Sequence, residues 1–507
     1  MRPADVHAPP PVDSSSPKSV NDLQRPLDHF RANKKRLEIH HTEKLVLWVV
    51  CAHLVFLPWA LGTMWIWAQF TSFALAVVGF GLSLLPRSYT EEHTGSNSFR
   101  LFMWPRLVRF PLFWLGAALL GYVALQALNP AWAFVSNGKG WWMQKIEHTP
   151  WLPPGVDTPF ERWNPWRMLL IYSAAWLTVC TLWVGLTRRR SLQTLFIVVA
   201  TNGLLLAIFG IAQRLMGNGK LFWFVDSPNP AFFSSFVYKN HASAYLLLTL
   251  AVTCGLAAWY YLRGLRRLEK SNPSGVFTFF ATCIAVAILT SYARGVTLTM
   301  LAFLAICVAV FIGHQLLMKN TTRKPIVAVV LLFVFGFFLK TGLEALNTGE
   351  AWSRLKIGLN REDASLASRE WATESAVAML KEHWTTGVGA GAFRYLFPIY
   401  QHQNPRLITR PMFWEHAHND IVQFPIELGL FGALAIAASA GYLLLSLTRS
   451  YFWENPLSGC TVLGTSLLVV YAWWDFPFQC PAILITWCAL GVAITLWTKL
   501  EEMNVRG

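Results

Sequence analysis

Long apolar segments dominate this chain and decide what it can fold into. Hydrophobic residues make up 54% of its 507 positions and charged residues only 14%. The apolar residues fall in runs of about 20, the length of a helix that crosses a bilayer. This pattern predicts an all-α integral membrane protein, a bundle of about 12 transmembrane helices. The predicted spans are 45–63, 66–85, 108–128, 167–186, 194–215, 241–262, 275–292, 295–316, 325–346, 420–447, 457–474 and 480–498.

Clusters of arginine and lysine orient these spans. In a twelve-span arrangement every cluster falls on one side, which the positive-inside rule makes the cytoplasm. Both termini are then cytoplasmic, and the longer loops 129–166, 217–240 and 347–419 face outward. The net charge of +15 is scattered over short loops, so it reflects topology and does not favour binding of nucleic acid. The clusters lie at 34–36, 87–109, 188–190, 263–270, 319–324 and Arg449.

The N-terminal segment and the cysteines carry no sign of secretion. Residues 1–40 are expected to form a disordered cytoplasmic tail, because the first 30 are rich in proline, serine and polar residues and lack the apolar core of a signal peptide. The spans within 41–200 form an N-terminal group of transmembrane helices. None of the eight cysteines lies in a long outer loop, so neither a disulfide framework nor a metal site is expected.

Polar and charged residues gather where several predicted spans meet the outer face. Such groups are costly near hydrocarbon unless they line a wet cavity. We therefore expect one shared cavity that holds cations, imidazoles and carboxylates. The residues are Arg214 at the end of the fifth span, Lys239-Asn240-His241 at the start of the sixth, Arg294 after the seventh, His418 before the tenth and Asp475 after the eleventh.

The start of the tenth span is the richest of these places. Asp420-Ile421-Val422-Gln423 has the spacing of a capping box, so helix initiation alone can account for Asp420 and Asn419. Asp420, Gln423 and Glu427 share one helix face, which should point at protein or water. Capping explains neither Glu427 nor the histidine that precedes the span.

The histidines and the cations have both functional and structural interpretations. His418 is expected to act in catalysis or substrate binding, with a structural hydrogen bond as the alternative, and for His416 the two interpretations are even. Arg294 can hold a phosphate with two parallel hydrogen bonds, or serve only as an interfacial anchor. Lys239 and His241 are the second candidate contact for phosphate, with helix capping as the alternative.

The outer loops have local patterns of their own. In loop 347–419, apolar residues at helical spacing from Ala372 to His383 predict an amphipathic helix that lies over the membrane face. The glycines of 387–391 predict a turn, since no strand precedes them. The tryptophans of loop 129–166 are typical of an aromatic belt, with sugar stacking as the alternative.

Taken in order, these motifs resemble the bacterial O-antigen ligase and O-antigen polymerase superfamily, which comprises lipid-linked glycan ligases, polymerases and related oligosaccharyltransferases. The resemblance covers roughly 200–485, so 201–500, including loop 347–419, is expected to be the catalytic region. It rests on His418-Asn419 followed after nine residues by Gly429-x-x-Gly432, on Lys239-Asn240-His241-Ala242, on Tyr292-Ala293-Arg294-Gly295, on Ser368-Arg369 and on Asp475-Phe476-Pro477-Phe478-Gln479.

The resemblance implies an inverting glycosyltransferase that uses neither a metal nor another cofactor. The donor would be an undecaprenyl-pyrophosphate-linked glycan, and the acceptor a hydroxyl of a glycan or of lipid A–core, at the periplasmic face of the bacterial inner membrane among its lipids. His418 would be the base, oriented by Asp420 or Glu427, and Arg294 with Arg214 or Lys239 would stabilise the leaving group. Further substrate-binding residues would be Asn240, His241, Arg369, His416, Asn419 and Asp475.

Two other functions stay open at this point. A protein O-oligosaccharyltransferase would use the same chemistry on a serine or threonine acceptor. A transporter or flippase of lipid-linked sugars would instead place its site near the bilayer midplane, on helices related by internal repeats. The polar residues here gather at one face and no internal repeat is evident, which favours an enzyme.

Overall fold

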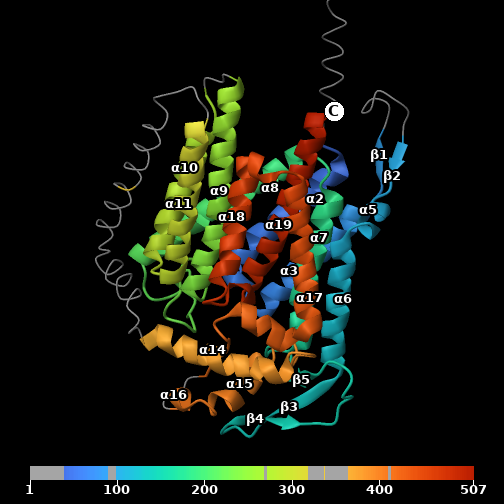
Figure 1. The fold of residues 1–507 in the computed structure, drawn as a ribbon, viewed down its shortest axis with the longest axis vertical. Coiled ribbons are helices and arrows are strands. Elements are labelled where there is room, and N and C mark those ends of the chain that lie inside the picture. The colour runs from blue at the N-terminus through green and yellow to red at the C-terminus, as the bar shows by residue number, and fades with distance from the viewer. Residues whose placement is uncertain are drawn as a thin grey trace, which may run out of the picture.

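The computed structural model describes residues 39–89, 99–267, 271–317, 364–408 and 413–506, with the single position 336. Helices dominate this part of the chain (Figure 1). Nine of the described helices are long and apolar enough to cross a membrane, so the chain is a multi-pass membrane protein. They are α2 (His41–Trp59), α3 (Ile66–Leu84), α6 (Pro111–Leu128), α7 (Pro165–Gly185), α8 (Arg189–Leu215), α9 (Lys239–Arg267), α11 (Arg294–Leu317), α17 (Asp420–Arg449) and α19 (Pro481–Arg506).

Two shorter apolar helices, α10 (Ser274–Thr290) and α18 (Pro456–Tyr471), complete the described bundle. Together with the nine longer helices they correspond to all the predicted spans except 325–346, which, apart from position 336, lies outside the described residues. The membrane bundle is therefore confirmed, whereas the count of twelve spans is not.

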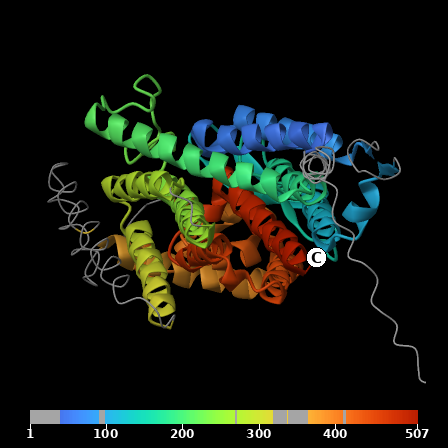
Figure 2. The ribbon, with the colours of Figure 1, turned by 90° about the horizontal axis from the view of Figure 1, so that it is seen from above.

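Burial decides which helices form the centre of the bundle. In α9 and α19, 83% and 78% of the apolar stretch is buried by protein, against 17% in α17. A helix that is apolar all round belongs inside a bundle or against lipid. Accordingly α19 lies between α2 and α3 on one side and α10 and α11 on the other (Figure 2), while α17 turns Leu430, Leu434 and Leu444 outward.

The two ends of the bundle differ. At one end lie the hairpin of β1 (Arg87–Tyr89) and β2 (Phe99–Leu101) and the short helix α5 (Trp104–Val108) (Figure 1). Here Arg87 and Glu43, both fully buried, form an ion pair of 2.7 Å. Glu43 also accepts hydrogen bonds from the backbone N–H groups of Thr187 and Arg188, so this pair ties α2 to the hairpin and to the α7–α8 connection.

At the opposite end, three short strands form a sheet that the sequence did not predict. β3 (Pro130–Ser136) pairs antiparallel with β4 (Trp141–Lys145) and parallel with β5 (Gly155–Asp157). Trp132, Phe134 and Trp141 pack against the neighbouring helices of this end, whereas Trp151 is 79% exposed. Some tryptophans of this loop therefore pack against protein, and others lie on the surface. The protein is not purely α-helical, because it also contains this sheet and the β1–β2 hairpin.

A layer of helices covers the same end of the bundle. α14 (Ala364–His383) runs across it, next to α15 (Phe393–Gln401) and α16 (Pro405–Ile408) (Figure 1). Ala372, Ala376 and Met379 are fully buried in one cluster, which confirms the helix predicted from their spacing. This layer lies directly over the helix ends at which the polar residues were expected.

Candidate active site

The start of α17 is fixed by two side chains with separate tasks. The side chain of Asn419 accepts a hydrogen bond from the backbone N–H of Val422 at 3.2 Å, so Asn419 is the helix cap, and the expectation that Asp420 caps the helix is corrected. The Asp420 carboxylate instead accepts from the N–H of Phe478 at 2.8 Å and from the Gln479 amide at 3.1 Å. It therefore holds the short helix η3 (Pro477–Gln479) against α17.

Glu427 holds a second loop. Its carboxylate accepts from the N–H of Gly391 and from the Gln423 amide, each at 3.0 Å. Its backbone carbonyl accepts from the N–H of Gly389. Gly387, Gly389 and Gly391 all have positive φ, which confirms the turn predicted for 387–391. The carboxylates of Asp420 and Glu427 thus position loops around the site.

Gly429 breaks α17 where this loop packs on it. Its φ of 63° and ψ of −167° belong to a region that is essentially open only to glycine. A Cβ added to Gly429 would lie 2.5 Å from the carbonyl oxygen of Thr385. The break therefore lets the glycine turn approach α17 at backbone distance.

Gly429→Ala is expected to destabilise the protein by about 1–3 kcal/mol, because alanine would be strained at this φ and would collide with backbone. Thermal unfolding of the purified protein in detergent measures the loss. Gly441→Ala in the same helix is the matched control, since a Cβ there meets only open space. Equal unfolding temperatures for the two variants would contradict the assigned role of the break.

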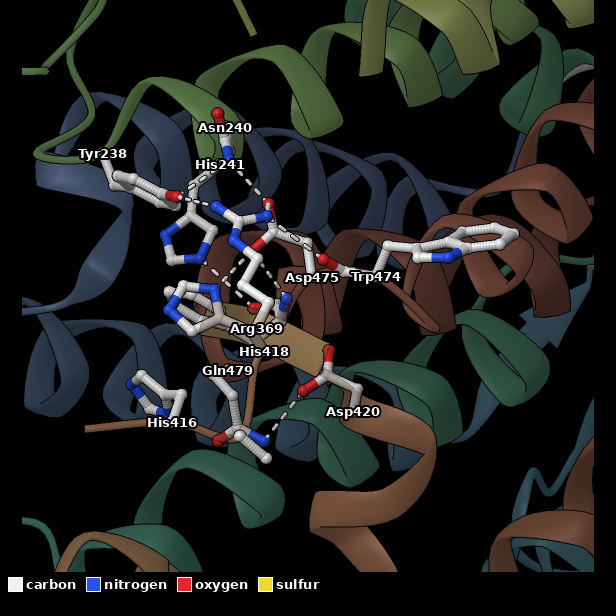
Figure 3. A network of polar contacts seen from close by, with 12 residues as sticks. Tyr238, Asn240, His241, Arg369, His416, His418, Asp420, Trp474, Asp475 and Gln479 are labelled. Atoms are coloured by element: carbon white, nitrogen blue, oxygen red, sulfur yellow. Dashed lines mark hydrogen bonds and ion pairs between the residues drawn. The ribbon is translucent and has the colours of Figure 1, made fainter. Parts of the chain in front are cut away.

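His418 lies just before this helix with its ring beside a carboxylate (Figure 3). Its φ of 52° is left-handed, an uncommon conformation for histidine that is often found at functional sites. The ring Nδ1 lies 3.5 Å from Oδ1 of Asp475, and within the described ranges it meets no partner with good hydrogen-bond geometry. The side chain remains 20% exposed, so a substrate can reach it.

The protonation of His418 follows from this position. Burial lowers the pKa of His418, and the neighbouring Asp475 opposes this shift only in part. The imidazole is therefore neutral at neutral pH and has a free lone pair with which to accept a proton.

Asp475 is the centre of the polar network in Figure 3. Its Oδ2 accepts hydrogen bonds from the Asn240 amide at 2.6 Å and from the Tyr471 hydroxyl, and Nη1 of Arg369 lies 3.8 Å from it. Burial alone would raise the pKa of Asp475, but the contacts with His418 and Arg369 outweigh burial and hold this pKa below its usual range. Asp475 is therefore ionised beside the neutral ring.

Arg369 brings a cation to the site from α14. Its guanidinium donates to the carbonyl of Trp474 at 3.2 Å and to the Tyr238 hydroxyl at 3.5 Å. Burial opposes the charge, yet Asp475 and Tyr238 outweigh it and raise the pKa of Arg369. With its side chain 26% exposed, Arg369 can still offer N–H donors to an anion.

The ring of Phe476 contacts three histidines, two from the stretch before α17 and one from the start of α9. His416 stacks on it at 4.5 Å, while His241 and His418 stand perpendicular to it at 5.0 and 4.6 Å. Nε2 of His241 also lies 3.2 Å from the carbonyl oxygen of Phe476. The Asp475-Phe476 pair therefore provides one aromatic ring for the imidazoles and one carboxylate for the cations.

His416 belongs to a deeper layer with an arginine that sequence reasoning missed. Nη2 of Arg394 lies 3.3 Å from Nε2 of His416. Burial, and then the charge of Arg394, lower the pKa of His416 well below its usual value. Arg394 also pairs with Glu415 at 3.5 Å. Its position between Phe393 and Tyr395 in an otherwise apolar stretch was the signal that could have revealed it.

The remaining cations lie at adjoining helix ends. The Arg214 guanidinium is 4.7 Å from the centre of the Tyr292 ring, in the turn that leads into Arg294. Gly295 packs so closely on Tyr471 that a Cβ would lie 2.7 Å from its ring. The turn that contains Arg294 therefore packs against Tyr471, whose hydroxyl donates a hydrogen bond to Asp475. Lys239 begins α9, directly before Asn240.

The described residues contain no group of three or more His, Cys, Asp and Glu side chains that could hold a metal ion. The fold and the site together define a multi-pass membrane protein. Imidazoles, a buried carboxylate and arginines gather at one end of its helices. Residues 277–437, about a third of the chain, match the family described as O-antigen ligase, which belongs to the superfamily that the sequence motifs resemble. No protein of curated function matches the chain.

The matched range divides the site. It contains Arg294, Arg369, His418 and Glu427 but ends before Asp475 and begins after Asn240. The partners of His418 therefore come from the flanking helices, which the fold brings back to the same end of the bundle.

Proposed function

We propose that this protein transfers a glycan from an undecaprenyl-pyrophosphate carrier to a hydroxyl of a lipid A–core or a growing polysaccharide, at the periplasmic face of the bacterial inner membrane. The observation that carries the proposal is the neutral, reachable ring of His418 beside the ionised Asp475. The family match supports the class of reaction.

In the proposed reaction the acceptor oxygen attacks the anomeric carbon while His418 takes its proton. The bond from that carbon to the pyrophosphate oxygen breaks, and the electron pair leaves with the pyrophosphate. A single displacement of this kind inverts the anomeric carbon and needs no metal or other cofactor. Asp475 orients the ring and stabilises the imidazolium that forms, which is the role expected of Asp420 or Glu427 from sequence.

Negative charge builds on the departing pyrophosphate, and cations must stabilise it. Arg369 lies beside the His418–Asp475 pair, with Nη1 3.8 Å from the carboxylate. Arg294 adjoins the same group through the contact of Gly295 with Tyr471. We assign Arg369 and Arg294 to the pyrophosphate, with Arg214 and Lys239 at the outer rim.

Arg294→Lys is expected to lower transfer by 10- to 100-fold, about 1.4–2.8 kcal/mol, with protein abundance unchanged. Lysine reaches an interface as well as arginine does, but it lacks the planar fork that matches two phosphate oxygens. Glycan gels of cells carrying the variant measure the loss. Full activity would leave Arg294 an anchor and move its role to Arg214 and Lys239.

The acceptor is tested by reconstituting the purified protein in vesicles with a labelled lipid-linked glycan. Lipid A–core, a second lipid-linked glycan and a serine-rich peptide are offered separately. We expect label on one of the first two acceptors. Label on the peptide would assign a protein O-oligosaccharyltransferase, and movement of intact donor across the bilayer without transfer would assign a transporter.

A further inference from the structure

A polar cavity lies at the end of the bundle opposite the candidate active site. It has a volume of about 530 Å³. Its walls come from the first turn of α8, the last turns of α9 and α19, and the start of α18. The lining residues are Arg189, Arg190, Gln193, Trp259, Leu262, Arg263, Arg266, Glu454, Asn455, Pro456 and Glu501.

The charges of this cavity do not cancel. Four arginines line it against two glutamates. Glu501 is already engaged, since it pairs with Arg189 at 2.7 Å and accepts a hydrogen bond from the Asn455 amide. Glu454 is the only other carboxylate among the lining residues. Within the described ranges, it forms no ion pair with Arg190, Arg263 or Arg266.

The walls that carry these arginines are well braced. The Arg189 guanidinium lies over Trp497 at 4.4 Å and over Trp259 at 5.6 Å. Asn455 caps α18 by accepting from the N–H of Leu457 at 2.9 Å. Arg189, Trp259 and Asn455 are thus held in place, while the excess positive charge is left for a ligand.

We propose that this cavity binds the phosphate group of an anionic phospholipid headgroup. Guanidinium groups match phosphate oxygens in pairs, and basic pockets between transmembrane helices on the cytoplasmic side are typical headgroup sites. The cavity lies where α8 begins and α9 ends, the level of headgroups for spans of this length. Leu262, Trp259 and Pro456 give it the apolar wall that a glycerol backbone and the first acyl carbons require.

The positive-inside rule alone does not account for these features. That rule requires arginine or lysine in the loops at this end, but it requires neither a cavity nor convergence of the side chains upon it. Arg449, at the end of α17, meets the same topological need without lining the cavity. It is therefore a matched control for a test that separates topology from binding.

The test follows thermal unfolding of the full-length protein in non-ionic detergent. Phosphatidylglycerol, phosphatidylcholine or inorganic phosphate is added at matched ionic strength. We expect phosphatidylglycerol to raise the unfolding temperature of the wild type and phosphatidylcholine to leave it unchanged. An equal rise with inorganic phosphate alone would support a phosphate site but assign it to a soluble ligand, and no rise with either would overturn the proposal.

Two sets of variants complete the test. Arg190, Arg263 and Arg266 are changed together to lysine, which keeps the charge that membrane insertion requires, or together to glutamine. The lysine set should lose part of the phosphatidylglycerol shift and the glutamine set most of it, whereas Arg449→Gln should keep it. A full shift in the lysine set, or in a folded glutamine set, would overturn the proposal.

Discussion

Replacing His418 by alanine is expected to lower glycan transfer by about two to four orders of magnitude, or about 2.7–5.4 kcal/mol of barrier. The ring is the proposed base, and no other imidazole of the site can take its place. His416 lies against Arg394, and His241 against the carbonyl of Phe476. Alanine keeps the Cβ, so the left-handed backbone at position 418 gains no new strain.

Glycan gels of whole cells and immunoblots of their membranes measure this effect. We expect long-chain product to disappear while the protein level stays normal, since the side chain is partly exposed and lies outside the packed core. His148→Ala is the control, because His148 is exposed and lies between β4 and β5, two strands at the same end of the bundle (Figure 1). Retained product in the His418 variant would remove it from catalysis.

Asp475→Asn is expected to lower the rate by about a hundredfold or more, because the ring loses the charge that orients it and stabilises its protonated form. Asparagine has the same shape and can still pair with Asn240 and Tyr471, so the loop should stay folded. The steady-state rate of the purified variant, with its thermal unfolding temperature, measures both effects. A loss of stability that matches the loss of rate would indicate a structural role.

The pH profile separates these roles further. Burial lowers the pKa of His418 below its ordinary 6.5, so the base form persists at mildly acidic pH, and the wild-type rate should fall only as the pH drops through this lowered pKa. Removing the charge of Asp475 should lower the pKa further and move the acid limb to still lower pH. Asp420→Asn should leave the limb in place, because its carboxylate contacts η3.

Much of the bundle and part of the site follow from sequence because they depend on local patterns. Apolar runs of bilayer length predict helices wherever the structure describes them. The spacing of Ala372, Ala376 and Met379 predicts α14, and the glycines of 387–391 predict a turn. His418 could be singled out because titratable groups beside apolar spans need a reason to be there, whereas Arg369 was indicated only by the resemblance of Ser368-Arg369 to the family pattern.

The partner of His418 could not be predicted in this way. Asp420 is only two residues from His418 in sequence, but the two residues have different backbone conformations. His418 is left-handed and precedes the helix cap, whereas Asp420 lies in the first helical turn and its carboxylate contacts η3. Asp475 reaches the ring only because α18 returns to the same end of the bundle, a non-local contact.

The short strands β3 to β5 could not be predicted for a related reason, since strands of three to seven residues are stabilised by the helices they cover.

The most direct test of the proposed chemistry is a single-turnover assay with purified wild-type protein and the His418→Ala variant in vesicles that contain a labelled lipid-linked glycan and an acceptor. Formation of the glycosidic bond and release of the lipid pyrophosphate are measured in the same samples. We expect the two products to appear together in the wild type and both to slow by at least about a hundredfold in the variant. Equal rates in the two proteins would contradict the assignment of His418 as the base.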